Sequence, residues 1–141
     1  MAIVVARWVA ASVAALGLMH VYWALGGRMG KSAAVPEVNG QQTFIPSRAG
    51  TMAVAAALFF AATVVAIAGG LFEAGGFKGI FRILAFGLSA TFIARAVGDF
   101  RLVGFFKRVR GTDFARLDTA IFAPLCLLLG LAVLFVAYND V

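Results

Sequence analysis

The sequence is short of charge, cysteine and histidine, and each shortage excludes a class of function. Charged residues make up 13% of the 141 residues, which is about half the share in a soluble domain. The only cysteine, Cys126, excludes an intramolecular disulfide, a CxxC redox pair and a thiolate metal site. The only histidine, His20, excludes a two-histidine metal or haem site within one chain. We therefore expect no metal and no other cofactor.

Common enzyme motifs are also missing. The sequence has no GxxxxGK phosphate loop, no HExxH and no GxSxG, and no paired carboxylates beside a suitable base. Catalytic residues stay unassigned, and whether the protein is an enzyme stays open. A membrane enzyme with His20 or Asp118 as its acid or base is one alternative.

Hydrophobic residues are abundant, and the few charges are mostly positive. Hydrophobic residues make up 63% of the chain, and the net charge is +6. The bases fall between apolar runs, where they set membrane orientation and attract anionic lipid headgroups. This placement argues against nucleic acid as a partner and favours membrane lipids.

Four apolar runs are each long enough to cross a bilayer, which takes about 20 residues. We predict an all-α membrane protein, a single antiparallel four-helix transmembrane domain. Its predicted spans are residues 3–25, 51–72, 80–97 and 114–138. A cleavable signal peptide is the alternative for the first run, but that run continues for about ten residues beyond its small residues at 12–15. In the second run, Ala53, Ala57 and Ala61 and, on a neighbouring face, Ala62, Ala66 and Gly70 favour close helix packing.

The connections carry signals of their own. Asn39-Gly40 predicts a β-hairpin in the first connection, with a plain loop as the alternative. Residues 100–109 alternate apolar and basic positions and predict a short interfacial helix between spans three and four. Thr112 or Asp113 is suited to cap the fourth span. Pro124 lies too deep for a first turn and predicts a kink.

Ionisable residues from three spans are expected at one depth. His20 is close to the end of span one, Arg95 and Asp99 end span three, and Asp118 begins span four. Such residues are costly in a membrane and face partners or a wet cavity. We expect Arg95 to pair with Asp99 or Asp118. A structural clasp of ion pairs and a ligand site are both open interpretations. For His20, the alternative to a ligand-binding role is an interhelical hydrogen-bond donor.

Bases outnumber acids in this region. The nearby acids Asp99 and Asp118 are outnumbered by four bases, which leaves guanidinium donors for a phosphate or carboxylate: Arg95, Arg101, Lys107 and Arg108. The run from Lys107 to Arg110 is also predicted to be exposed and to serve mainly as an orientation signal.

Two blocks carry a family resemblance. HVYWALGG at His20–Gly27, followed by Pro36, and GDFRLVGFFKR with FARLDTAIFAP between Gly98 and Pro124 resemble a bacterial family of small four-span membrane proteins. That family is described only as a domain of unknown function. The resemblance covers nearly the whole chain and implies the four-span fold, but it implies no activity. It directs attention to these matching residues: His20, Tyr22, Trp23, Gly27, Asp99, Arg101, Lys107, Asp118 and Pro124.

Counting bases predicts the orientation. The first and third connections carry Arg28, Lys31, Arg48, Arg101, Lys107, Arg108, Arg110 and Arg116, and the opposite side carries Arg7, Lys78 and Arg82. The excess predicts that these two connections are cytoplasmic and both termini lie outside the bacterial inner membrane.

The leading hypothesis is a protein that binds an amphipathic or anionic ligand, such as a lipid or isoprenoid headgroup, between spans one, three and four. The predicted site is His20, Tyr22, Trp23, Arg95, Asp99, Arg101, Lys107 and Asp118. Alternatives are an enzyme acting on such a lipid, an accessory subunit of a membrane complex, and a small oligomeric transporter. A homo-oligomer or another membrane protein would then be the partner.

Overall fold

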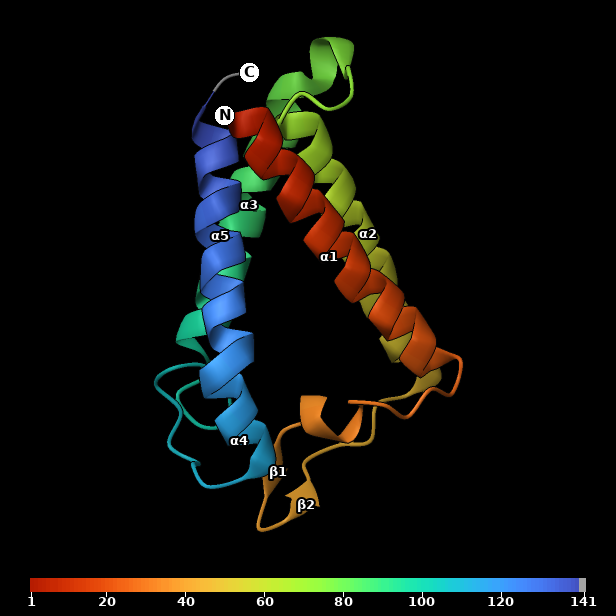
Figure 1. Ribbon diagram of the computed structural model, residues 1–141, viewed down its shortest axis with the longest axis vertical. Coiled ribbons are helices and arrows are strands. Elements are labelled where there is room, and N and C mark those ends of the chain that lie inside the picture. The colour runs from red at the N-terminus through yellow and green to blue at the C-terminus, as the bar shows by residue number, and fades with distance from the viewer. Residues whose placement is uncertain (140–141) are drawn as a thin grey trace.

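The computed structural model describes residues 1–139, and its architecture is all-α (Figure 1). Its long helices alternate in direction, and they are α1 (Ala2–Ala24), α2 (Arg48–Ala68), α3 (Lys78–Val97) and α5 (Ala123–Tyr138). The fourth span begins before α5, with α4 (Asp113–Leu117) and a π turn (Asp118–Phe122). Within the described residues, four helices are long and apolar enough to cross a membrane. The predicted membrane fold is confirmed, with helix boundaries within four residues of the predicted spans.

The helices form two pairs that meet at one end of the molecule. α1 packs along α2, and α3 packs along α5. The pairs converge near the termini and diverge toward the other end, so the molecule has the outline of an inverted V (Figure 1). We call the converged end the terminal end. The other is the strap end, because residues 25–47, here called the strap, cross it.

The buried core lies toward the terminal end. It is drawn from the first half of α1, the second half of α2, the first half of α3 and the second half of α5. Val13, Val65 and Val133 are inaccessible to solvent. Gly69, just after α2, lies so close to Ala6 of α1 that a Cβ on the glycine would overlap the Ala6 methyl group. Small residues therefore allow the close helix approach that dispersion requires in lipid.

The predicted small-residue faces of α2 are only partly buried. Ala61, Ala62 and Ala66 are buried, as expected, but Ala53 and Ala57 are exposed. These two alanines lie in the half of α2 where the helix pairs have diverged. In that half Ala55 is the buried small residue instead, and Gly70, the last of the predicted small residues, is exposed.

The strap contains the predicted hairpin. Strands β1 (Glu37–Val38) and β2 (Gln41–Gln42) pair antiparallel, with Glu37 opposite Gln42. Asn39 and Gly40 both have positive φ, 53° and 76°, as a type I′ turn requires. A short 3-10 helix, η1 (Ser32–Ala34), precedes the hairpin and lies against α4. The strap thus extends from the first helix pair to the second (Figure 1).

Residues 98–112, here called the basic loop, do not form the predicted interfacial helix, so that prediction was wrong. No residue in this loop is helical. Gly98 and Gly104 have φ of 94° and 86°, in the left-handed region that glycine tolerates. Their backbones pass so closely that a Cβ on either would overlap the other segment. The amphipathic period was real, but these glycines fold the segment back on itself.

The fourth span begins as predicted at a threonine cap. The Thr112 hydroxyl accepts a hydrogen bond from the Ala115 backbone N–H at 3.0 Å. Pro124, which cannot donate a backbone hydrogen bond, lies just beyond the π turn. The disturbance predicted at this proline therefore takes the form of a π turn.

Candidate functional site

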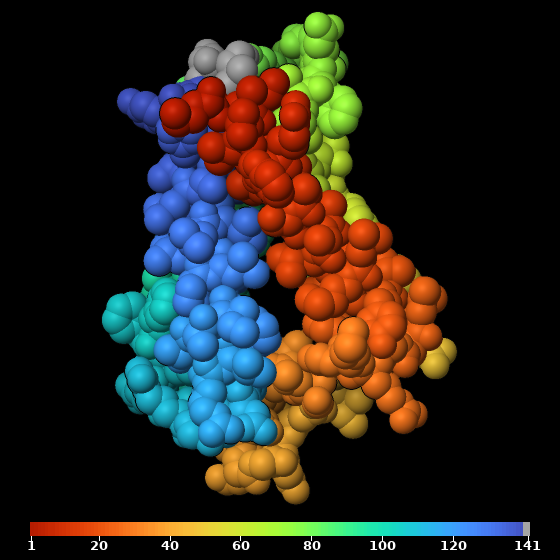
Figure 2. All heavy atoms as spheres, viewed as in Figure 1, coloured from red at the N-terminus to blue at the C-terminus, as the bar shows by residue number. Residues whose placement is uncertain are grey.

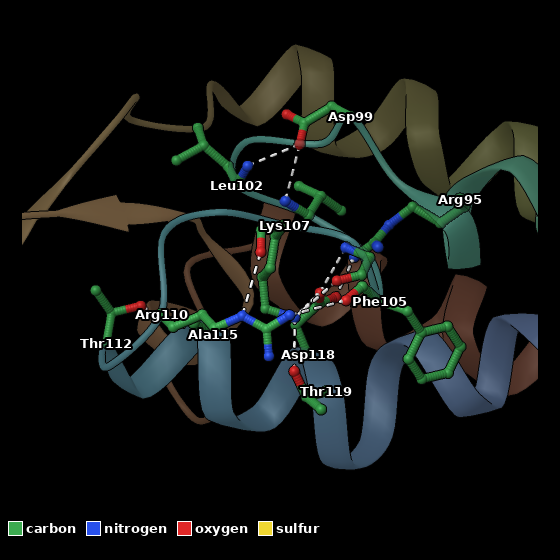
Figure 3. A network of polar contacts seen from close by, with 12 residues as sticks. Arg95, Asp99, Leu102, Phe105, Lys107, Arg110, Thr112, Ala115, Asp118 and Thr119 are labelled. Carbon is green, nitrogen blue, oxygen red and sulfur yellow. Dashed lines mark hydrogen bonds and ion pairs between the residues drawn. The ribbon is translucent and has the colours of Figure 1, made fainter.

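The centre of the candidate site is the Asp118 carboxylate, which is inaccessible to solvent. Its Oδ1 accepts a hydrogen bond from Arg95 Nη2 at 2.9 Å. Its Oδ2 accepts from the Gly104 backbone N–H at 2.7 Å and from Lys107 Nζ at 3.0 Å. The Asp118 side chain therefore joins the fourth span, to which it belongs, to α3 and the basic loop (Figure 3). We call Arg95, Lys107 and Asp118 the buried cluster; Lys107 and Asp118 are buried, and the Arg95 side chain is 35% exposed.

Lys107 is the largest of the fully buried side chains, at 2% exposure. Besides Asp118, its ammonium group donates to the Gly104 carbonyl at 2.8 Å and to Thr119 Oγ1 at 2.7 Å. These contacts account for all three donors of the ammonium group. The prediction that Lys107 belongs to an exposed run was therefore wrong. Arg108 and Arg110 beside it are exposed, as predicted.

Asp99 shapes the basic loop from outside the cluster. Its Oδ1 accepts hydrogen bonds from the backbone N–H groups of Arg101, Leu102 and Val103 at 2.9, 2.7 and 3.0 Å. Slight burial raises the pKa of the Asp99 carboxyl, but the backbone hydrogen bonds outweigh it and lower that pKa below its usual value. The predicted Arg95–Asp99 pair was wrong, because Arg95 pairs with Asp118 instead.

Arg95 retains an unpaired terminal nitrogen. Its Nη2 is bound to Asp118, while its Nη1 is buried and has no hydrogen-bond partner within residues 1–139. Buried polar groups in proteins are nearly always paired. The buried cluster also carries two basic groups against one carboxylate. An unfilled donor and an excess positive charge thus lie together.

Helix periodicity places Arg95 on the inner side of α3. Leu88 and Phe92 pack against the core. Arg95 follows Phe92 by three residues and Leu88 by seven, so all three lie on the same stripe. Arg95 continues this stripe beyond the level where the helix pairs separate. Figure 2 shows an opening at the strap end, between α1, the fourth span and the strap.

His20 occupies the corresponding position on α1. It follows Val13 and Leu16 on the core-facing stripe of that helix. Its Nδ1 donates to the Leu16 carbonyl at 2.8 Å, so Nε2 is the acceptor in the neutral ring. His20 and Arg95 therefore continue the core-facing stripes of opposite helix pairs toward the strap end.

Trp23 fixes the first residues of the strap. Its indole Nε1 donates to the Met29 carbonyl at 2.8 Å, and its ring meets His20 edge-on at 5.0 Å between centroids. Tyr22 is exposed and lies over Gly27, where a Cβ would overlap its ring. The Tyr22 ring therefore leaves no room for a side chain at position 27.

A pocket of about 490 Å³ lies where α1, the strap and α2 meet. Its polar lining includes His20 and Lys31, and its apolar lining includes Trp23, Val35 and Val54. Sequence reasoning missed Lys31 as a site residue, because it looked like an ordinary orientation signal in a loop.

The predicted site residues therefore divide into separate groups. The structure joins Arg95, Lys107 and Asp118 directly and places Asp99 in the adjoining loop. His20 and Trp23 line the pocket on the first helix pair. Tyr22 and Arg101 are exposed outside both groups.

Comparison with known proteins gives a family without an activity. Residues 13–133 match the family described as a protein of unknown function, DUF3995, and the chain belongs to that family. The matched range covers both the buried cluster and the pocket. No curated protein and no solved structure matches the chain.

Proposed function

We propose that this membrane protein binds an amphipathic anionic molecule, such as a lipid or an isoprenoid carrying a negative headgroup. The headgroup lies in the opening at the strap end, against the Arg95 guanidinium. The observation that carries this proposal is the buried, unpartnered Nη1 of Arg95 beside a cluster with excess positive charge. A phosphate or carboxylate oxygen would supply the missing acceptor.

The other members of the buried cluster act through Arg95. Asp118 holds Nη2 and so fixes the plane of the guanidinium. Lys107 neutralises Asp118 and ties it to the basic loop. The clasp and the ligand site are then the same structure, because the pairing that fixes two helices also orients the donor that binds.

The first helix pair supplies the opposite wall. Lys31 brings a positive charge to the pocket, whose lining also includes His20. Trp23, Val35 and Val54 provide apolar surface suited to a hydrocarbon chain. We propose that the strap end faces the cytoplasm of a bacterial cell, an orientation that the excess of basic residues in its connections supports.

The proposal is tested by replacing Arg95 with lysine. Arg95→Lys keeps a cation for Asp118 but removes the forked guanidinium and its second terminal nitrogen. We expect bound lipid, measured by mass spectrometry of the protein purified in mild detergent, to fall about tenfold, the loss typical of one charged hydrogen bond. Arg108→Lys is the matched control on the exposed side of the basic loop.

The folded state is checked in the same samples. Arg95→Lys should keep its helical circular dichroism and elute as the wild type does. Wild-type protein that carries no lipid, or an Arg95→Lys variant with undiminished lipid, would contradict the proposed site.

A further inference from the structure

The strap reaches the second helix pair through one carboxylate. Glu37 Oε1, at the start of the hairpin, accepts hydrogen bonds from the backbone N–H groups of Asp113 at 2.8 Å and Phe114 at 3.4 Å. Asp113 and Phe114 are the first residues of α4, and the first N–H groups of a helix have no partner within it. A residue 76 positions earlier in the chain therefore caps this helix together with Thr112.

Both sides of this contact are prepared for it. On the strap, the Thr43 hydroxyl and backbone N–H donate to the Pro36 carbonyl at 3.0 and 2.9 Å, beside Glu37. On the helix, the positive end of the dipole favours a carboxylate. The Asp113 carboxylate, which would oppose Glu37, is paired with Arg116.

Next to this contact, the strap also forms part of the pocket. Val35, two residues before Glu37, lines the pocket and is 4% exposed. η1 rests on α4 just before it. The first residues of the strap are held to α1 by the hydrogen bond from Trp23 to the Met29 carbonyl. The strap is thus joined to α1 and α2 by its two ends, and it contacts α4 through the Glu37 cap and η1.

We infer that the strap is a latch at the edge of the opening, and that the Glu37 carboxylate on the N-terminus of α4 holds it against the second helix pair. Release of this cap lets the strap move away from α4 and exposes Val35 and the pocket behind it. The role of the latch in admitting an anionic ligand rests on the proposed function, but the latch itself does not. A capping side chain of this kind shifts a closed–open equilibrium about fivefold.

The latch is tested by thiol labelling of the full chain without added ligand. Cys126→Ser removes the native thiol, and Val35→Cys places a new one behind the strap. Labelling by a charged maleimide in detergent follows the population of the open form. Glu37→Ala should raise the labelling rate at position 35 about fivefold.

Two controls bracket this result. Glu37→Gln keeps the side-chain oxygen that accepts both hydrogen bonds, and its labelling rate should stay within about twofold of the parent because most of the cap remains. Glu73→Ala removes the other glutamate, which is exposed in the turn after α2, and should leave the rate unchanged.

An unchanged labelling rate in Glu37→Ala would overturn the latch. If Val35→Cys fails to fold, Ala34→Cys provides a second reporter in the same pocket, with the same expected response. Wild-type protein that carries no lipid would overturn the proposed function and leave the labelling result intact, so the two failures are distinguishable.

Discussion

The two ends of this molecule are built on different principles. At the terminal end, alanines, valines and a glycine bring four helices into close contact. At the strap end, the helix pairs separate, and charged groups and backbone hydrogen bonds connect the segments. Tight packing at one end frees the other from holding the helices together. The strap end can therefore keep an unfilled donor and an opening that would be costly in a uniformly packed bundle.

The largest expected effect breaks the polar end. Asp118→Ala leaves Lys107 buried without its counter-ion, and removing one partner of a buried ion pair costs about 3–5 kcal/mol. We expect a marked fall in thermal stability in detergent, followed by circular dichroism. Combining it with Lys107→Met removes the stranded charge and should restore part of the loss.

A surface pair provides the comparison for that prediction. Asp113→Ala breaks the exposed pair with Arg116 and should cost less than about 1 kcal/mol. If Asp118→Ala proved as mild as Asp113→Ala, the buried cluster would not stabilise the strap end in the way argued above.

The second effect tests the packed end. Gly69→Ala places a methyl group against Ala6 and should destabilise the protein by about 1–3 kcal/mol, the usual cost of overpacking. Gly87, in the middle of α3, has open space where a Cβ would lie. Gly87→Ala should therefore be neutral or stabilise the helix by up to about 1 kcal/mol. Equal melting temperatures for the two variants would contradict close packing at the terminal end.

The smallest effect concerns the basic loop. Because folding lowers the pKa of Asp99, its contribution to stability is complete above the ordinary carboxyl pKa of about 3.9 and is lost as pH falls through the lowered value. Wild type should melt slightly above Asp99→Asn at pH 6, and this difference should shrink toward pH 3. A difference that grows on acidification would contradict the assigned hydrogen bonds.

Local signals in the sequence were sufficient for the helices and the hairpin. Four long apolar runs must form helices in a membrane, because backbone groups find no other partners there. Asn39-Gly40 marks its turn because both residues tolerate positive φ. The Arg95–Asp118 pair was among the expected pairings, since the two residues end and begin successive spans.

The misses all involve contacts that sequence proximity does not reveal. Lys107 lies among exposed arginines in the sequence, and only the fold of the basic loop turns it inward. The helical period of that loop concealed the close approach of Gly98 and Gly104. Glu37 looked like an ordinary strand residue, because the helix that it caps lies 76 positions away.

The π turn at Asp118–Phe122 separates the rotational settings of the two parts of the fourth span. Each added residue rotates a helix by about 100°, so the wider turn changes the phase of α4 relative to α5. α5 can then pack its buried residues against the core, while α4 turns its first N–H groups toward Glu37. Sequence changes in one part need not misdirect the other.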